Sequence, residues 1–308
     1  MGKREYCEIM KQHFPGFYTY TKQELKELIG KSTIVFGASV LLDLLKISYG
    51  KDFLDIVSKE VGLDRLWLPY DTAWLYHERL ATVIDEQIKN VDSAASALNR
   101  LKDSFSDNRQ HPYISDPLKI NFDKMLNSLK EALEKDKNFL LGHLNNSPLR
   151  KRIDEMFRDR IGEPYEQNQL EQLYLESEER HKQHRHPSLY FSSSKNIRIR
   201  HHRLIIWKQI ERYAQEEKKP IVLVLNRITP NWFFIYNDAL VRPHQNLINE
   251  FIENTGQNIY IITAHELIDR LTSKKTTDVN NLLNQLKNTP DQAYNQQTDL
   301  MENTATAL

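Results

Sequence analysis

One segment of the chain has residue types that suit the binding of phosphate. No acidic residue occurs from Arg180 to Ile210, although 42 acidic and 42 basic residues balance over the 308-residue chain. A local excess of positive charge attracts phosphates, and arginine can bind them with two parallel hydrogen bonds. Tyr190 and Phe191 could stack on unpaired bases. The candidate nucleic-acid-binding residues are Arg180, Arg185, Lys195, Arg198, Arg200 and Arg203, with Arg227 further along the chain.

Two other interpretations of this basic segment stay open. A solvated helix end followed by a loop would have the same composition. The histidines could also suggest a zinc site, because His181 and His184 are three residues apart and His201 and His202 follow. No cysteine or nearby carboxylate completes a tetrahedral ligand set, so we expect no metal in this segment.

A few carboxylates could form a site for a hard cation. Asp43 follows Ser39 by one helical turn, and Glu78 lies in a later predicted helix, with Asp71 and Asp238 as further candidates. Mg²⁺ and Mn²⁺ prefer oxygen ligands, so convergence of these side chains would permit metal-dependent hydrolysis. The simpler interpretation is that each carboxylate is solvated or paired with a nearby arginine.

Apolar runs separated by helical patterns predict the elements that position these residues. Residues 220–225 are almost entirely apolar, which is typical of a strand buried on both faces of a parallel sheet. Thr21 and Glu24 form a capping-box pattern at a helix start. Further strands are expected at 33–36, 65–68 and 258–262, and helices at 40–48, 53–61, from about 72, 203–214, 243–254 and 264–271.

This alternation predicts an α/β fold with a parallel sheet flanked by helices. Sites in such sheets lie beyond the carboxyl ends of the strands, here at Gly37, at Pro69 and at Asn226. We expect one domain over residues 1–272, with a helical and basic insert at about 90–200. Leu118, Phe122, Met125, Leu129 and Leu133 form an amphipathic pattern within this insert. The tail, 273–308, is expected to be disordered apart from a helix at 279–286.

Short motifs occur in a characteristic order between residues 13 and 271. They are Phe14-Pro15-Gly16-Phe17, Ile34-Val35-Phe36, Arg65-Leu66-Trp67-Leu68-Pro69, Gly162-Glu163-Pro164-Tyr165, Lys219-Pro220-Ile221-Val222 and Arg242-Pro243. In order and spacing the chain resembles the bacterial PIN-like domain family, in its long form with a helical insert. The resemblance implies hydrolysis of RNA phosphodiesters with one or two divalent metals held by clustered carboxylates.

The chain departs from this family pattern where acidic metal ligands are implied. Those positions hold Gly37, Leu75, Arg203, Asn226 and Arg227. The side chains of glycine and leucine cannot bind a metal, and the permanent charge of arginine repels one. We therefore expect a catalytically degenerate PIN-like protein that binds nucleic acid or another phosphate-bearing ligand, or that regulates another protein, with no metal cofactor.

Two alternatives remain. The first is an active endoribonuclease, a toxin or a defence effector, in which Asp43 and Glu78 replace the lost ligands and hold Mg²⁺ or Mn²⁺. The second is a structural subunit that pairs with another protein. The single cysteine, Cys7, and the lack of a signal peptide or of an apolar run of about 20 residues suggest a cytoplasmic protein away from membranes.

Overall fold

Short parallel strands form the sheet that the sequence predicts. In the computed structural model their order is β2-β1-β3-β6, with all neighbours parallel. The strands are β1 (Thr33–Phe36), β2 (Leu66–Trp67), β3 (Ile221–Leu225) and β6 (Ile259–Thr263). The structure describes residues 9–10, 13–18, 20–105, 115–145, 147–188, 195–226, 229, 231–236 and 239–287. An α/β fold with a parallel sheet flanked by helices is thereby confirmed.

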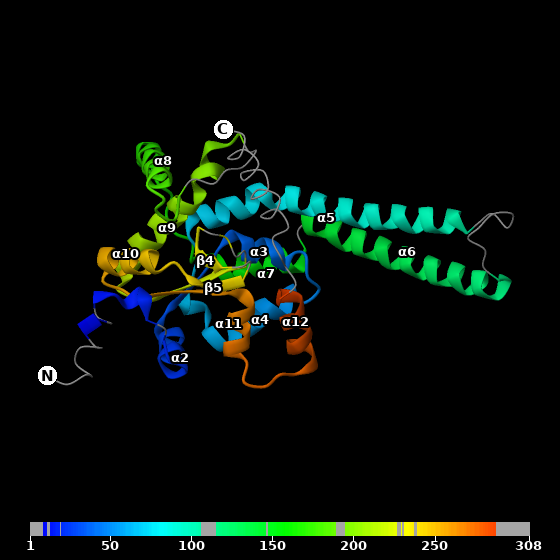
Figure 1. Cartoon of the computed structure of the whole chain (residues 1–308), viewed down its shortest axis with the longest axis horizontal. Helices are drawn as coiled ribbons and strands as arrows, with labels where there is room; N and C mark the ends of the chain where they lie inside the picture. Colours follow the sequence, from blue (N-terminus) through cyan, green and yellow to red (C-terminus); the bar gives the residue numbers. More distant parts are fainter. Residues whose placement is uncertain are drawn as a thin grey trace. The chain divides into compact units, whose positions relative to one another are not determined.

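One face of the sheet is covered by α9 (Ile197–Glu217) and α10 (Gln245–Thr255) (Figure 1). Val35 and Leu223 point into this layer from neighbouring strands and belong to one buried cluster with both helices. Trp207 of α9 is fully buried, and its ring centroid lies 5.2 Å from that of Phe251 of α10. Because side chains alternate along a strand, the residues next to Val35 and Leu223 in their own strands point to the opposite face of the sheet.

The opposite face packs against α3 (Ala38–Leu44), α4 (Gly50–Val61) and α11 (Ala264–Leu271). Phe36 contacts Phe53 of α4 and also Phe157, with centroid distances of 5.8 and 6.1 Å. The helix expected at 279–286 is α12 (Thr277–Lys287), which contacts α4 and α11. The described structure thus continues past residue 272, and residues 288–308 lie outside it.

The predicted start of the first long helix is confirmed by its cap. Helix α2 (Lys22–Lys31) begins after Thr21, whose hydroxyl accepts from the Glu24 amide, and the Glu24 carboxylate accepts from the Thr21 amide. A short 3-10 turn, η1 (Pro15–Phe17), precedes it and contacts α10. A second one, η2 (Leu63–Arg65), leads into β2.

The motif Gly162-Glu163-Pro164-Tyr165 has a structural role beside β2. A Cβ atom on Gly162 would lie 2.5 Å from the Trp67 ring, so only glycine fits this contact. The Glu163 carbonyl accepts a hydrogen bond from Arg212 at 2.8 Å, and the same guanidinium lies 4.6 Å from the Tyr165 ring centroid. These contacts fix the chain that leads to α8 (Gln167–Lys182) against α9.

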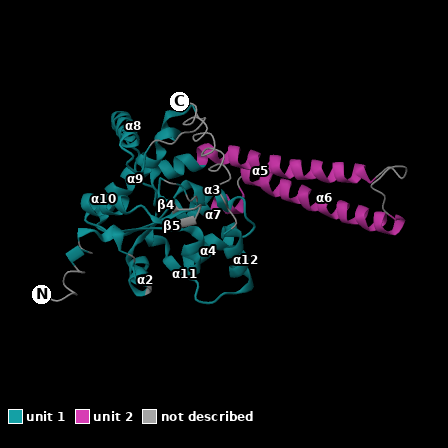
Figure 2. Cartoon of the chain, viewed as in Figure 1, with its two compact units in different colours: residues 1–76, 153–308 teal, residues 77–152 magenta. Residues whose placement is uncertain are grey.

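The chain divides into two compact units (Figure 2). The first comprises residues 1–76 and 153–308 and contains the sheet. The second comprises residues 77–152, so it begins and ends earlier than the insert expected at about 90–200. It contains most of α5 (Tyr70–Ser104), all of α6 (Asp116–Leu144) and the start of α7 (Pro148–Phe157). Residues 153–200 cluster with the sheet.

An antiparallel hairpin of β4 (Phe233–Tyr236) and β5 (Ala239–Pro243) was not expected from the sequence. In these two segments apolar and polar residues do not alternate, so the sequence lacks the pattern of a half-buried strand. Among the described residues, the helices are all too short or too polar to span a lipid bilayer.

Candidate functional site

The carboxyl end of β1 has no room for an acidic side chain in its present arrangement. The backbone N–H of Gly37 donates to the Val224 carbonyl of β3 at 2.9 Å. A Cβ atom on Gly37 would lie 2.6 Å from Cδ2 of Leu225, so an aspartate could be accommodated only if Leu225 moved. The volume beside this strand end is therefore filled by an apolar side chain of the neighbouring strand.

Asp43 is one of the carboxylates that the sequence analysis proposed as a substitute ligand. It is buried, and its Oδ2 accepts a hydrogen bond from Nδ2 of Asn226 at 2.6 Å. Its Oδ1 lies 2.7 Å from Nζ of Lys46. The Ser39 hydroxyl accepts from the Asn226 backbone amide at 3.3 Å. Asn226 and Asp43 are brought together as neighbours of Gly37, but the carboxylate is already neutralised by a lysine.

Leu75 and Glu78 lie in different surroundings although both belong to α5. Leu75 is buried in a small apolar cluster with Ala38 and Ile199, against which Trp74 packs. Glu78 is exposed and belongs to the second compact unit. The position at which the family resemblance implies a glutamate is thus part of a hydrophobic core.

Asp71 is the other fully buried carboxylate after a strand end. Arg198 Nε donates to its Oδ1 at 2.6 Å, and Gln209 Nε2 donates to its Oδ2 at 3.0 Å. The Arg198 guanidinium also lies over the Trp74 ring, 4.7 Å from its centroid. A buried carboxylate needs such partners to offset its loss of hydration. Arg198, expected to bind phosphate, is therefore engaged by a carboxylate within the fold.

These donors do not fit the divalent ion that the family implies. Over the described part of the chain, no three histidine, cysteine, aspartate or glutamate side chains are grouped so that they could hold a metal. Asp43 and Asp71 are each bound to a cation of the chain, Lys46 and Arg198. A metal would have to displace these cations. Arg227 and Asp238 lie outside the described residues.

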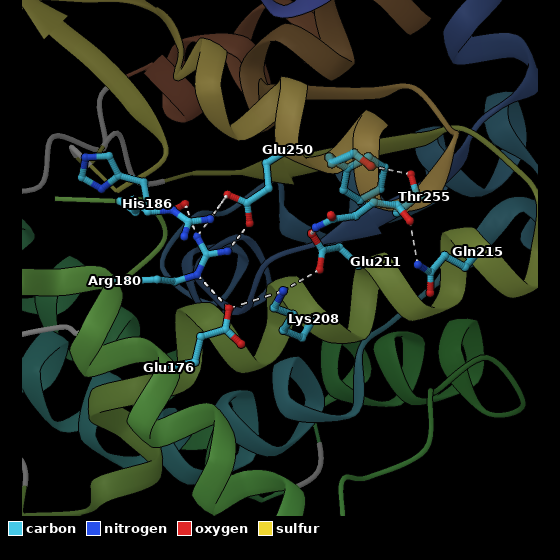
Figure 3. Close-up of polar contacts among 11 residues, drawn as sticks. Glu176, Arg180, His186, Lys208, Glu211, Gln215, Glu250 and Thr255 are labelled. Carbon is cyan, nitrogen blue, oxygen red and sulfur yellow. Dashed lines mark hydrogen bonds and ion pairs between the residues drawn. The ribbon is translucent and has the colours of Figure 1, made fainter. Parts of the chain in front are cut away.

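Carboxylates that precede or follow the basic segment in sequence neutralise much of it, and Figure 3 shows those around Arg180 and Lys208. The Arg180 side chain is only 3% exposed. Its Nε donates to Glu176 at 2.9 Å, and one terminal nitrogen donates to the His186 carbonyl at 2.9 Å. The other terminal nitrogen pairs with Glu250 of α10, which also pairs with Arg185 at 3.3 Å. Arg180 is a structural residue that joins α8 to α10.

Lys208 extends this network along α9. Its Nζ lies 3.4 Å from Glu176 and 3.0 Å from Glu211, and Glu211 accepts from Nδ2 of Asn254 at 3.0 Å. The network borders a polar groove of about 520 Å³ between α8 and α9. The three-residue spacing of Lys208 and Glu211 was a signal for an ion pair that the sequence analysis did not use.

Buried histidines add little charge to the segment. Burial, together with the adjacent His244 ring and Arg203, lowers the pKa of His186 to about 4. The rings of His186 and His244 are stacked with centroids 4.3 Å apart. Burial also lowers the pKa of His201, whose ring is tilted against that of Tyr174 with centroids 4.9 Å apart. His186 and His201 therefore add little positive charge to the segment at neutral pH.

Three of the candidate cations lie close together in sequence at the start of α9. Lys195 is exposed, and neither it nor Arg200 forms an ion pair with another described residue. Arg200 and Arg203 are half-buried and lie three residues apart on α9, which makes them neighbours on the helix surface. Tyr190 and Phe191, expected to stack on bases, lie outside the described residues.

The low pKa of His186 predicts a loss of stability in mild acid. An unfolded histidine has a pKa of about 6.5, so below that pH the unfolded chain binds a proton that the native protein excludes until about pH 4. Stability is therefore full above pH 6.5 and falls between about pH 6.5 and 4. We expect His186→Gln to reduce this fall by about 2 kcal/mol in urea unfolding at successive pH values.

Comparison with known proteins agrees with the fold. A family described as PIN like domain matches residues 33–247, from the first strand to α10. No curated protein and no solved structure matches the chain. The matched residues cover more than half of the chain and include the strand ends at Gly37 and Asn226. The chain belongs to the PIN-like domain family.

Proposed function

We propose that this PIN-like protein binds nucleic acid without cleaving it by metal-dependent hydrolysis. Membership of the family points to a nucleic-acid-related function. The observation that carries the second part of the proposal is the strand-end region. There Leu225 occupies the space beside Gly37, Leu75 lies in an apolar cluster, and Asp43 is paired with Lys46.

The electrostatics of this region oppose a divalent cation. At an effective dielectric constant near 20, two like unit charges ~4 Å apart repel by about 4 kcal/mol before screening by salt. A divalent ion bound to Asp43 would lie at a comparable distance from the Lys46 ammonium group, and its double charge would double this repulsion. The same holds at Asp71, where Arg198 is the partner. Each of these carboxylates is better explained as part of a structural ion pair.

The cations at the start of α9 are the proposed contact with the phosphate backbone. Lys195 precedes the helix, and Arg200 and Arg203 follow on its first two turns. Binding of this kind is independent of sequence and weakens steeply with salt, because each neutralised phosphate releases counterions. Arg180, Arg185 and Arg198 are not part of this proposed surface, since carboxylates of the fold engage them.

Fluorescence anisotropy with a labelled single-stranded RNA tests this binding surface. For the double variant Arg200→Gln/Arg203→Gln we expect about tenfold weaker binding at low salt. The slope of log K against log salt should become shallower by about 1.4, since each phosphate contact on a single strand contributes ~0.7.

The matched control removes the same charge elsewhere in the same compact unit. Lys51→Gln/Lys59→Gln replaces two exposed lysines of α4 and should leave both the affinity and the slope close to those of the parent protein. Equal losses in the two double variants would show that only net charge matters. Absence of binding at low salt would contradict the proposal and favour a structural subunit.

A further inference from the structure

Three aromatic side chains gather around Arg198 at the start of α9. The guanidinium carbon of Arg198 lies 4.7 Å from the ring centroid of Trp74 and 5.6 Å from that of Tyr70, both on α5. Tyr174 of α8 is the third. Burial raises the pKa of its hydroxyl, and the positive charge of the nearby Arg198 opposes this rise. We call Tyr70, Trp74 and Tyr174 the aromatic cluster; all three belong to the first compact unit.

The aromatic cluster lies at the carboxyl end of the parallel sheet. Tyr70 begins the helix that follows β2. Trp74 packs against the small buried cluster that contains Ala38, and Ala38 directly follows Gly37 at the end of β1. Ligand sites of parallel α/β sheets lie beyond this end of the strands. The rings therefore occupy the part of the fold in which a ligand is expected.

The rings are partly accessible, and their polar tips are not used by the fold. Each of the three side chains is half-buried. Over the described part of the chain, neither tyrosine hydroxyl nor the Trp74 indole N–H has a hydrogen-bond partner, and none of these atoms is fully buried. Buried tyrosine and tryptophan residues usually pair their polar tips. These tips thus face solvent, and the ring edges that carry them can be reached by a ligand.

An ion pair beneath the aromatic cluster holds it in place. Asp71 is fully buried and accepts from Nε of Arg198 at 2.6 Å and from Nε2 of Gln209 at 3.0 Å. The Arg198 side chain is 20% exposed, so part of the guanidinium also remains accessible beside the rings. Side chains that are already ordered lose little conformational freedom on binding, which favours association. Arg198 is in this sense a positioning residue for the rings.

The aromatic cluster adjoins the cations that we expect to contact phosphate. Arg198 follows Lys195 by three residues and precedes Arg200 by two, in the first turn of α9. Arg198 and Arg200 are about 3 Å apart along the helix axis but about 160° apart around it. A strand bound at Arg200 therefore reaches the rings across the N-terminal end of α9, where Lys195 is exposed.

We propose that unpaired bases of a single-stranded nucleic acid stack on the aromatic cluster and on the Arg198 guanidinium, an inference that rests on the proposed function. Aromatic rings beside a basic surface bind single strands with little sequence preference, because every base has a π-face. Bases in a duplex stack on each other, so their faces are not available. The sequence analysis expected this role for Tyr190 and Phe191, which lie outside the described residues, whereas these rings come from α5 and α8.

Fluorescence anisotropy at low salt with two labelled single-stranded RNAs of about 12 nucleotides tests this stacking. One strand carries all its bases, and the other lacks about four central bases but keeps every phosphate. The parent chain should bind the intact strand about tenfold more tightly. Trp74→Leu and Tyr174→Leu should each reduce this ratio to about threefold or less, while Trp74→Phe, which keeps a ring, should preserve most of it. The salt dependence should stay that of the parent chain.

The matched control changes a tyrosine at the other edge of the sheet. Tyr20 is also half-buried, and its ring lies edge-on to that of Tyr260 of β6, with centroids 5.9 Å apart. Tyr20→Leu should leave the ratio of the two affinities unchanged. The same two strands made of DNA should give the same ratio as RNA, because stacking does not use the 2′-hydroxyl group. Far-UV circular dichroism checks that each variant keeps its helix content.

Tryptophan fluorescence gives a readout of stacking that does not depend on affinity. Of the four tryptophans, Trp67, Trp207 and Trp232 are buried, whereas Trp74 is half-buried. A saturating amount of the intact strand should therefore quench the emission of Trp74, and the abasic strand should quench it much less. In the Trp74→Phe variant this quenching should be lost although the RNA is still bound.

Equal binding of the intact and abasic strands, without quenching, would overturn the stacking proposal and leave phosphate binding in place. Stacking would also be contradicted if Trp74→Leu and Tyr20→Leu changed the ratio equally, or if the ratio were confined to RNA. A failure of both strands to bind at low salt would instead overturn the proposed function, and stacking with it.

Discussion

Replacing Arg180 by methionine is expected to lower the free energy of unfolding by about 3 kcal/mol. The guanidinium is buried and joins Glu176 of α8, the His186 carbonyl and Glu250 of α10. Methionine can fill much of the volume, but it leaves Glu250 largely buried beside an apolar side chain, with Arg185 as its remaining partner. The loss of one member of a buried ion pair is costly because the other charge stays without compensation. Urea denaturation followed by circular dichroism measures the change.

Arg185→Met is the matched control, because Arg185 pairs with the same carboxylate. Its side chain is 55% exposed, compared with 3% for Arg180. Exposed ion pairs contribute about 0–1 kcal/mol, so this variant should lose less than about 1 kcal/mol. If both variants lost similar amounts, the network of Figure 3 would be a surface feature and Arg180 would be available for phosphate.

The sheet and most of its helices could be predicted because local patterns determine them. The unbroken apolar run at 220–225 indicates a strand covered on both faces, and β3 is buried at every position. The capping box at Thr21 and the helix at 264–271 are likewise found where the sequence placed them. Periodicity and capping act over a few residues, so they can be read without knowledge of the fold.

The electrostatic character of the basic segment could not be predicted in this way. No acidic residue lies within it, yet Asp71 and Glu250 pair with its arginines from other helices, and Glu176 pairs with Arg180 from one turn earlier in α8. Of these carboxylates only Glu176 is close in sequence to its partner. Charge balance within a segment therefore says little about charge balance in space. The division into two compact units was also not visible, since α5 runs through the boundary at residue 76 as one helix.

The strand ends include features that the sequence predicted and features that it did not. The sequence correctly indicated that Gly37 and Asn226 lie at strand ends, and the structure makes these ends neighbours because β1 and β3 are adjacent and parallel. It did not indicate that Leu225 fills the space beside Gly37, or that Asn226 donates to Asp43. Side-chain packing of this kind depends on register across the sheet, which a single sequence does not specify.

The largest functional effect expected here is the absence of metal-dependent RNA cleavage. An enzyme of this reaction type typically accelerates hydrolysis by ~10⁶-fold or more, so a working centre is easily detected. Such a centre needs several oxygen ligands that converge on the metal. The described strand ends instead offer single carboxylates, Asp43 and Asp71, that are each paired with a cation of the chain. The alternative of relocated ligands depends on Asp43 together with Glu78.

The measurement that tests this account most directly is the cleavage rate of a labelled single-stranded RNA by the full chain, with Mn²⁺ and with EDTA. The Asp43→Asn and Glu78→Gln variants, purified in parallel, serve as controls for contaminating ribonucleases. We predict equal rates with Mn²⁺ and EDTA for all three proteins, while the RNA is still bound at low salt. Mn²⁺-dependent cleavage by the parent chain that either variant abolishes would contradict the account, because it would show that the strand ends still hold a catalytic metal.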